Sequence, residues 1–120
     1  KLEFIKGDLR NKKLLRKIFS EKKNERNPIS SVIHFAGLKS MEESIKSPLE
    51  YWEANVESTL SLLHIMDEFD CNYIIFSSSA TVYGSKYKAS LKENFFNFPI
   101  NPYGETKATI ERILKTEPFL

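Results

Sequence analysis

The sequence has little cysteine, little net charge and no long apolar run: it contains one cysteine, Cys71, and a formal net charge of +2. A lone cysteine cannot close a disulfide within the chain or build a cysteine-based metal site, so we expect no metal. The basic residues between 12 and 23 are interrupted by Glu21 and fit a solvated helix face better than a nucleic-acid site. No segment is long and apolar enough to span a membrane. These absences favour a cytoplasmic protein that binds neither nucleic acid nor membranes.

What is present fits one soluble globular domain at most, since the chain has 120 residues, 41% hydrophobic and 28% charged. A chain of this length can bury only a modest core. Its first apolar run begins without any preceding turn or cap. We therefore expect the sequence to be an internal part of a longer protein.

Apolar periodicity predicts alternating strands and helices. We expect strands at 2–6, 31–36 and 72–77, and helices at 12–23, 41–69 and 102–115, with a long loop at 78–100. Pro48 should break the second helix because proline lacks the N–H that the helix ladder needs. The continuous apolar character of the second and third strands predicts burial on both faces. This order indicates a parallel α/β sheet.

Ligands bind beyond the carboxyl ends of the strands in such sheets, so the residues after each strand are candidate site residues. Asp8 follows the first strand, residues 35–39 follow the second and residues 77–81 follow the third. Tyr103 and Lys107 then open the last helix, just after a proline that can start it. We expect these groups to gather at one edge of the sheet.

Tyr103 is the only one of the five tyrosines with a lysine four residues later. Positions i and i+4 share a helix face, so Tyr103 and Lys107 point into the same space. A nearby cation favours the phenolate and lowers the tyrosine pKa. Such a tyrosine can exchange a proton with a substrate hydroxyl near neutral pH. An exposed pair on a solvated helix is the alternative.

Other candidates have two interpretations each. Asp8 could accept hydrogen bonds from an adenine or ribose, or cap the next helix. Lys39 could reach a phosphate or lie on the surface. Asn55, within an apolar helix, could satisfy a buried backbone group or reach a ligand. His34 is flanked by apolar residues and is predicted to be a core histidine. The serines at 77–79 could donate to a hydroxyl or simply end a strand, and no Gly-x-Ser-x-Gly makes one a nucleophile.

Four motifs together resemble the UDP-glucose 4-epimerases, a family of the extended short-chain dehydrogenases/reductases. They are HFAGLK at 34–39, PLEY at 48–51 with Asn55-Val56, SSSATVYG at 77–84, and NPYGxTK at 101–107. The likeness covers nearly the whole chain in order. It implies an NAD-dependent isomerase of galactose metabolism that interconverts UDP-glucose and UDP-galactose through a 4-keto sugar, with bound NAD regenerated in each turnover.

The resemblance also implies residue roles. Tyr103 would be the acid/base at the sugar 4-hydroxyl, Lys107 would lower its pKa and hold the nicotinamide ribose, and Ser79 would hydrogen-bond the same hydroxyl. Ala80 and Thr81 would lie beside the sugar with Ser79 and Tyr103. The residues implied to line NAD are Asp8, Leu9, Phe35, Ala36, Gly37, Leu38, Lys39, Asn55, Ser77, Tyr103 and Lys107.

Three other functions stay open. Related nucleotide-sugar dehydratases carry an Asp-Glu pair where this chain has Ala80-Thr81, which disfavours elimination of water. A 4-epimerase acting on another UDP-sugar, such as an N-acetylated or uronic form, is compatible with the motifs. A degenerate domain without catalysis is the third possibility.

The Gly-x-x-Gly-x-x-Gly loop that binds a dinucleotide pyrophosphate occurs nowhere in the chain. By resemblance, residues 1–120 form a partial Rossmann-like NAD(P)-binding domain, a doubly wound parallel sheet lacking its first two strands and this loop. Its strand at 2–5 should then not pair with 32–35, whereas 32–35 and 73–76 should be adjacent and parallel. The isolated chain is expected to be inactive. The family's dimer, built from helices at about 47–69 and 102–115, implies a homodimer in the full-length protein.

Overall fold

Two parallel strands, β1 (Ser31–His34) and β2 (Tyr73–Phe76), form the only sheet in the described part of the computed structural model, which is residues 2–116. Ser31 lies opposite Tyr73 and His34 opposite Phe76. Both strands are rich in β-branched and aromatic residues, which suit a pleated backbone. The predicted pairing of 32–35 with 73–76 is confirmed. Lys1 and residues 117–120 lie outside the described part.

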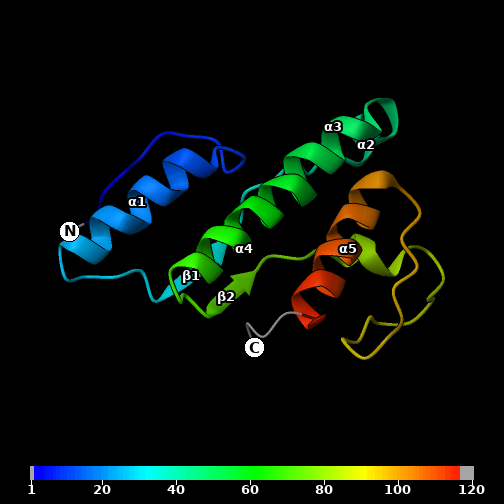
Figure 1. Ribbon diagram of the computed structural model, residues 1–120. Helices are drawn as coiled ribbons and strands as arrows, with labels where there is room; N and C mark the ends of the chain where they lie inside the picture. The colour runs from blue at the N-terminus through cyan, green and yellow to red at the C-terminus, as the bar shows by residue number, and fades with distance from the viewer. Residues whose placement is uncertain (1, 117–120) are drawn as a thin grey trace.

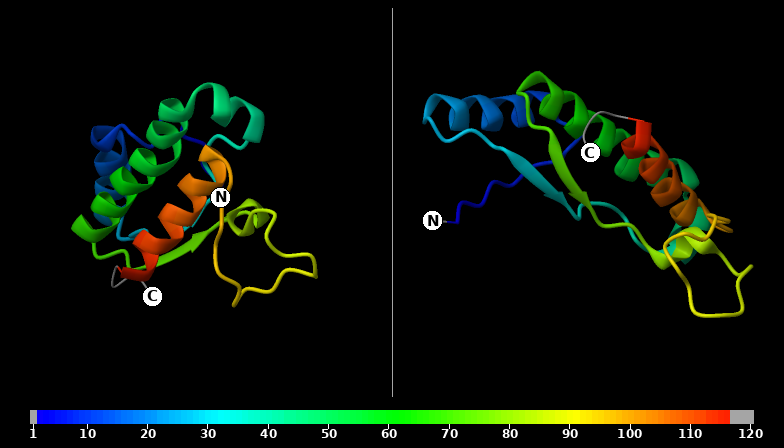
Figure 2. Two further views of the ribbon diagram at one scale, coloured as in Figure 1. Left: turned by 90° about the vertical axis from the view of Figure 1, so that its right-hand side faces the viewer. Right: turned by 90° about the horizontal axis from the view of Figure 1, so that it is seen from below.

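Helices cover one face of this sheet, and the right-hand view of Figure 2 shows them on a single side of the strands. Helices α1 (Lys12–Asn24) and α5 (Pro102–Thr116) lie on either side of α4 (Ser58–Glu68), as Figure 1 shows. The Asn11 side chain caps α1 by accepting from the Leu14 N–H at 3.1 Å. Buried apolar residues of α1 and α4 form the main core: Leu15, Phe19, Leu62, Leu63, Ile65 and Met66.

The continuous helical segment from Pro48 to Glu68, here called the helical rod, leads into the core. The helical region that contains it is more divided than the sequence predicts. Helix α2 (Met41–Lys46) ends before Pro48, which begins α3 (Pro48–Tyr51). A wider π-helical segment η1 (Trp52–Glu57) then runs into α4. Pro48 breaks the helix as predicted, but η1 was not predicted, because an apolar pattern does not distinguish one extra residue per turn.

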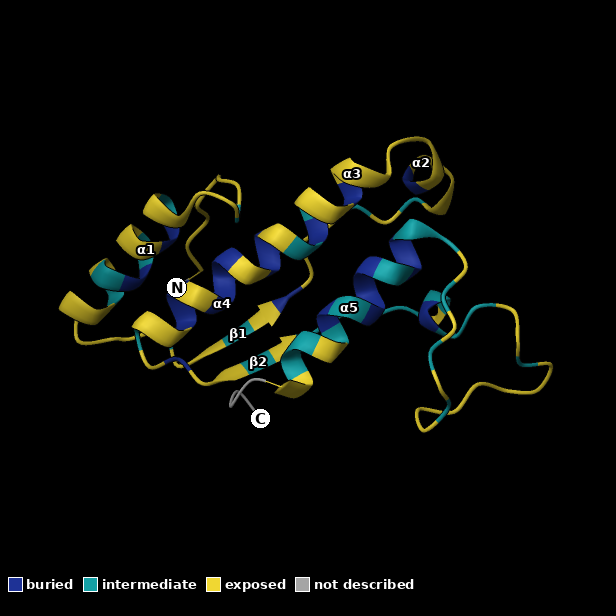
Figure 3. Cartoon of the chain, turned by 45° about the vertical axis from the view of Figure 1, so that its right-hand side comes forward, coloured by how far each residue is buried: buried dark blue, intermediate teal, exposed yellow. Residues whose placement is uncertain are grey.

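The predicted strand at 2–6 is wrong: residues 2–7 form no strand. This segment pairs with neither β1 nor β2, as expected from the resemblance, and an extended segment is a strand only when a neighbour shares its hydrogen bonds. The predicted burial of both faces of the sheet is also wrong. Ile33 and Ile75 are 60% and 65% exposed, and Figure 3 shows the strands largely exposed.

The loop at 78–100 contains a short 3₁₀ helix, η2 (Ala80–Tyr83), and is otherwise irregular, close to the prediction. Within residues 2–116, no helix is both long and apolar enough to cross a membrane. The same residues contain no cluster of three His, Cys, Asp or Glu side chains arranged to hold a metal.

The contact between α1 and α4 leads to a stability prediction. Phe19 is 5% exposed, and its ring centre lies 5.6 Å from that of Phe69. Phe19→Ala should lower the free energy of urea unfolding by about 3–5 kcal/mol, since it removes a buried ring and leaves a cavity. Phe35→Ala is the matched control, because Phe35 is 74% exposed. A Phe19→Ala loss no larger than the control's would contradict the packing of α1 on α4.

Candidate functional site at the carboxyl ends of the strands

The first turn of α5 carries the Tyr-Lys pair. Asn101 caps this helix by accepting from the Gly104 N–H at 2.8 Å, and Pro102 is its first residue. Tyr103 and Lys107 are 8% and 5% exposed. The alternative of an exposed pair on a solvated helix is therefore wrong.

The Lys107 ammonium lies at the carboxyl end of β2. It donates to the Ser77 carbonyl oxygen at 2.9 Å and lies 4.6 Å from the centre of the Phe76 ring and 6.0 Å from that of Tyr103. Burial lowers the pKa of Lys107, because desolvation disfavours its charged form. The carbonyl and the ring faces compensate part of that loss. Lys107 thus joins α5 to the residue that follows β2.

Ser79 lies where the serine run turns into η2. Its Oγ accepts from the Thr81 N–H at 3.3 Å and from the Thr81 hydroxyl at 2.9 Å, which leaves its own hydrogen to donate elsewhere. Gly104 on α5 packs closely on this segment, since a Cβ at Gly104 would lie 3.0 Å from the Thr81 carbonyl oxygen. The residue next to Tyr103 therefore touches the segment that carries Ser79.

Tyr51 supports the ring of Tyr103 from α3. The two rings meet edge to face, with centres 6.4 Å apart. The Tyr51 hydroxyl accepts from the Ser40 N–H at 3.0 Å and donates to Glu43 at 3.3 Å. Burial raises the pKa of Tyr51. Tyr51 is therefore fixed at both its ring and its hydroxyl, and it limits where the Tyr103 ring can move.

His34, at the end of β1, is a core histidine as predicted. Its Nε2 lies 2.9 Å from the Thr59 hydroxyl, and that hydroxyl donates to the Asn55 carbonyl at 2.6 Å. Because Thr59 has only one hydrogen to donate, His34 must carry its proton on Nε2. Burial, with a smaller contribution from the Lys107 charge, lowers the pKa of His34 to about 4.

A cleft of about 400 Å³ opens beside residues 36–38, which follow β1, whereas Lys107 lies beside the residue that follows β2. Predicted site residues from distant parts of the sequence meet in it: Asp8, Leu9, Ala36, Gly37 and Leu38. The helical rod supplies the remaining wall with Glu50, Ala54 and Ser58. A volume of about 400 Å³ lies within the range of small-molecule binding sites.

Asn55 holds one wall of this cleft from behind. Its side-chain oxygen accepts from the Leu38 N–H at 2.7 Å, and its amide donates to the Leu38 carbonyl at 3.0 Å and to Thr106 at 3.1 Å. A Cβ at Gly37, where φ is +151°, would lie 2.8 Å from the Asn55 oxygen. The structure therefore decides between the two interpretations of Asn55: it satisfies backbone groups, and Gly37 allows the close approach.

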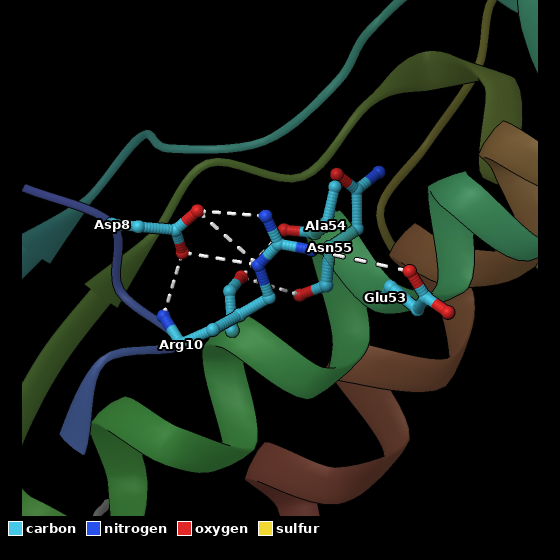
Figure 4. A network of polar contacts seen from close by, with 6 residues as sticks. Asp8, Arg10, Glu53, Ala54 and Asn55 are labelled. Atoms are coloured by element: carbon cyan, nitrogen blue, oxygen red, sulfur yellow. Dashed lines mark hydrogen bonds and ion pairs between the residues drawn. The ribbon is translucent and has the colours of Figure 1, made fainter.

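Asp8 faces the cleft with its charge paired. Arg10 donates to both carboxylate oxygens, at 2.7 Å from Nη2, and Figure 4 shows its guanidinium between Asp8 and Glu53. These bonds lower the pKa of Asp8 to about 2. The capping alternative for Asp8 is wrong, because Asn11 caps α1.

Some expected residues lie elsewhere, and others were missed. Phe35 and Lys39 are exposed and do not line the cleft, Asn55 lies behind one of its walls, and Ser77 does not line it. Sequence reasoning missed Arg10, Glu50, Ala54 and Ser58. The four-residue spacing of Glu50, Ala54 and Ser58, with two small side chains, was the available signal for a helix face that a ligand can approach.

Comparisons with known proteins agree on the class. The model of the family described as GDP-mannose 4,6 dehydratase matches residues 1–116. UDP-glucose 4-epimerase of Pisum sativum is 45% identical over 95% of this chain, and that of Dictyostelium discoideum is 46% identical over 95%. The structure of UDP-glucose 4-epimerase from Bifidobacterium longum in complex with NAD+ and UDP superposes with a TM-score of 0.84, at 43% identity over 93% of this chain.

The strands and helices define part of a Rossmann-like α/β fold. The chain belongs to the GDP-mannose 4,6 dehydratase family, and the resemblance to UDP-glucose 4-epimerases inferred from its motifs is confirmed. It spans about a third of the length of these relatives, at 31% and 32% of the two proteins and 32% of the crystallised chain.

The buried His34 predicts how stability depends on pH. As the pH falls, the unfolded chain, with a histidine pKa near 6.5, takes up a proton before the folded chain, whose His34 titrates at about 4. The contribution of His34 is therefore complete above about pH 6.5 and is lost as the pH falls to about 4, by about 3 kcal/mol in total. Urea unfolding at pH 5–7 should show stability rising with pH.

Removing the imidazole should abolish the contribution of His34 to the slope of unfolding free energy against pH. His34→Gln should have a shallower pH dependence than the unsubstituted chain, whereas His64→Gln, at an exposed position on α4, should keep the steeper one. Equal slopes for the chain and His34→Gln would show that His34 does not stay neutral in the folded state.

Proposed function

We propose that the protein carrying this chain is an NAD-dependent UDP-sugar 4-epimerase that interconverts UDP-glucose and UDP-galactose. One observation carries the proposal: Tyr103 and Lys107 are buried together beside the serine run, with Lys107 bonded to the Ser77 carbonyl. The names of the relatives at 45% and 46% identity support the choice of sugar nucleotide.

The cleft suits the adenosine part of NAD. Asp8 offers carboxylate oxygens for an amine or ribose, and Leu9 offers a backbone amide. Gly37 lines the cleft beside Ala36 and Leu38, and its missing Cβ lets Asn55 approach and fix this part of the wall. Solved relatives from Bifidobacterium longum and Brucella ovis contain NAD.

NAD, when bound, supplies a reversible hydride acceptor for the sugar carbon that is inverted. In this proposal Tyr103 removes the proton from the sugar 4-hydroxyl and later returns it to the same oxygen. The Lys107 ammonium lies 6.0 Å from the centre of the Tyr103 ring, and in this proposal it holds the nicotinamide ribose. Ser79 donates its hydroxyl hydrogen to the sugar oxygen and thereby orients it.

The remaining expected roles follow from position. Ala80 and Thr81, on the segment touched by Gly104, flank the sugar in this proposal. Asn55 and Ser77 act on the cofactor side indirectly, Asn55 by fixing Leu38 and Ser77 by fixing Lys107. Phe35 and Lys39, which are exposed outside the cleft, are assigned to the cofactor by the resemblance alone. The whole chain, residues 1–120, is then part of an NAD(P)-binding domain of a cytoplasmic enzyme.

A product assay tests the reaction. The protein expressed from the complete reading frame that encodes this chain should convert UDP-galactose to UDP-glucose, detected by chromatography or NMR. Tyr103→Phe should lower kcat by about 10²–10⁴-fold, because it removes the general acid/base. Tyr73→Phe, at an exposed residue of β2, is the matched control. A 4-keto-6-deoxy sugar as product, or full activity in Tyr103→Phe, would contradict the proposal.

We also propose that two copies associate through the helical rod. Exposed apolar side chains recur along it at helical spacing: Leu49 on α3, Trp52 on η1 and Leu60 on α4. An apolar stripe of this kind is typical of a face covered by another helix. The proposed partner is a second copy, with α5 completing the packed helices.

Sedimentation of the protein from the complete reading frame tests this association. The unsubstituted protein should sediment as a dimer, and Leu49→Lys should shift it to a monomer because a charge cannot be buried between apolar helices without a partner. Leu91→Lys is the control, since Leu91 is also exposed but lies in the loop at 78–100. A monomeric unsubstituted protein, or a Leu49→Lys dimer, would contradict the proposed interface.

A further inference from the structure

Glu111 continues the helix face that carries Tyr103 and Lys107. The three residues are four apart on α5, so their side chains lie one above the other. Lys107 donates to the Ser77 carbonyl at 2.9 Å, and the Ser78 hydroxyl donates to Glu111 Oε1. Two successive turns of α5 thus hold two successive residues of the serine run.

The second carboxylate oxygen of Glu111 is also engaged. Oε2 accepts from the Asn97 side-chain amide at 2.9 Å, and Asn97 lies near the end of the loop at 78–100. Within residues 2–116, no lysine or arginine forms an ion pair with Glu111. Its recorded contacts are hydrogen bonds from neutral donors, so its part in the structure is to orient them.

These contacts determine where Ser79 lies. Ser79 follows two residues that are both bonded to α5, and its backbone is extended, with φ −154° and ψ 146°. On its other side, Thr81 is in close contact with Gly104 on the same helix. The segment from 77 to 81 is therefore held by α5 at both ends. Glu111 and Ser79 also line the same pocket of about 370 Å³.

We propose that Glu111 is a positioning residue that holds Ser79 at a fixed distance from Tyr103 for the proton transfer. This inference rests on the proposed function. Glu111 reaches Ser79 only through Ser78, so it acts without touching the sugar. A displacement of about 1 Å in a reacting group can lower a rate about 10²-fold, which sets the scale of the expected effect.

Kinetics on the protein from the complete reading frame test the role. Glu111→Ala should lower kcat for UDP-galactose by about 10–100-fold and leave KM within about threefold. Glu111→Gln should recover most of kcat, because its amide oxygen can still accept from Ser78. Glu105→Ala, on the first turn of the same helix, should leave both constants unchanged. Unchanged kcat in Glu111→Ala, or failure of Glu111→Gln to recover it, would overturn the inference.

A double-mutant cycle separates positioning from general loss of structure. If Glu111 acts through Ser79, Glu111→Ala should lower kcat by less than about twofold when Ser79 is already alanine. Multiplication of the two single effects would overturn the inference.

Hydrogen exchange on the 120-residue chain provides a readout independent of catalysis. Glu111→Ala should speed amide exchange at residues 78–82 by about tenfold or more and leave residues 62–66 of α4 unchanged. Unchanged exchange at 78–82 would overturn the inference about Glu111. A protein from the complete reading frame that has no epimerase activity would instead overturn the proposed function, so the two failures are distinguishable.

Discussion

The hydrogen bond from the Lys107 ammonium to the Ser77 carbonyl is the contact on which the site depends. A lysine with only 5% of its surface exposed needs compensation for the water it has lost, and here a backbone carbonyl and the faces of Phe76 and Tyr103 provide it. Because the carbonyl belongs to the residue after β2, the contact fixes α5 against the end of the sheet. Tyr103 and the serine run come together as a consequence.

Asn55 provides a second connection of the same kind. Its amide bonds the Leu38 backbone on one side and Thr106 on the other, and Thr106 in turn donates to the Tyr103 carbonyl at 2.7 Å. The π-helical turn places Asn55 there, and the hydroxyls of Ser58 and Thr59 bond carbonyls within that wider turn. The wall of the cleft and the helix that carries Tyr103 are therefore joined through one buried amide.

Charge is distributed unequally between the two sides of the strand ends. On the α5 side, the Lys107 amine lies 6.0 Å from the centre of the Tyr103 ring, and burial lowers the pKa of His34 to about 4, so that His34 is neutral near pH 7. On the cleft side, Arg10 keeps Asp8 ionised without leaving its charge unpaired. In the proposed epimerase this arrangement keeps the phenol near Lys107 and offers the adenosine a carboxylate whose charge is paired.

The sequence by itself determined the order of the elements, the core position of His34 and the Tyr-Lys pair, because periodicity and i, i+4 spacing act locally. The family resemblance added the parallel pairing of 32–35 with 73–76. Only the tertiary structure decided that the segment at 2–6 is not a strand and that Ile33 and Ile75 are exposed, since pairing and burial depend on which neighbours cover them. It also decided that Arg10 pairs with Asp8, that Asn55 bonds Leu38, and that Glu111 reaches Ser78. The last two are contacts between residues 17 and 33 positions apart, which no local pattern records.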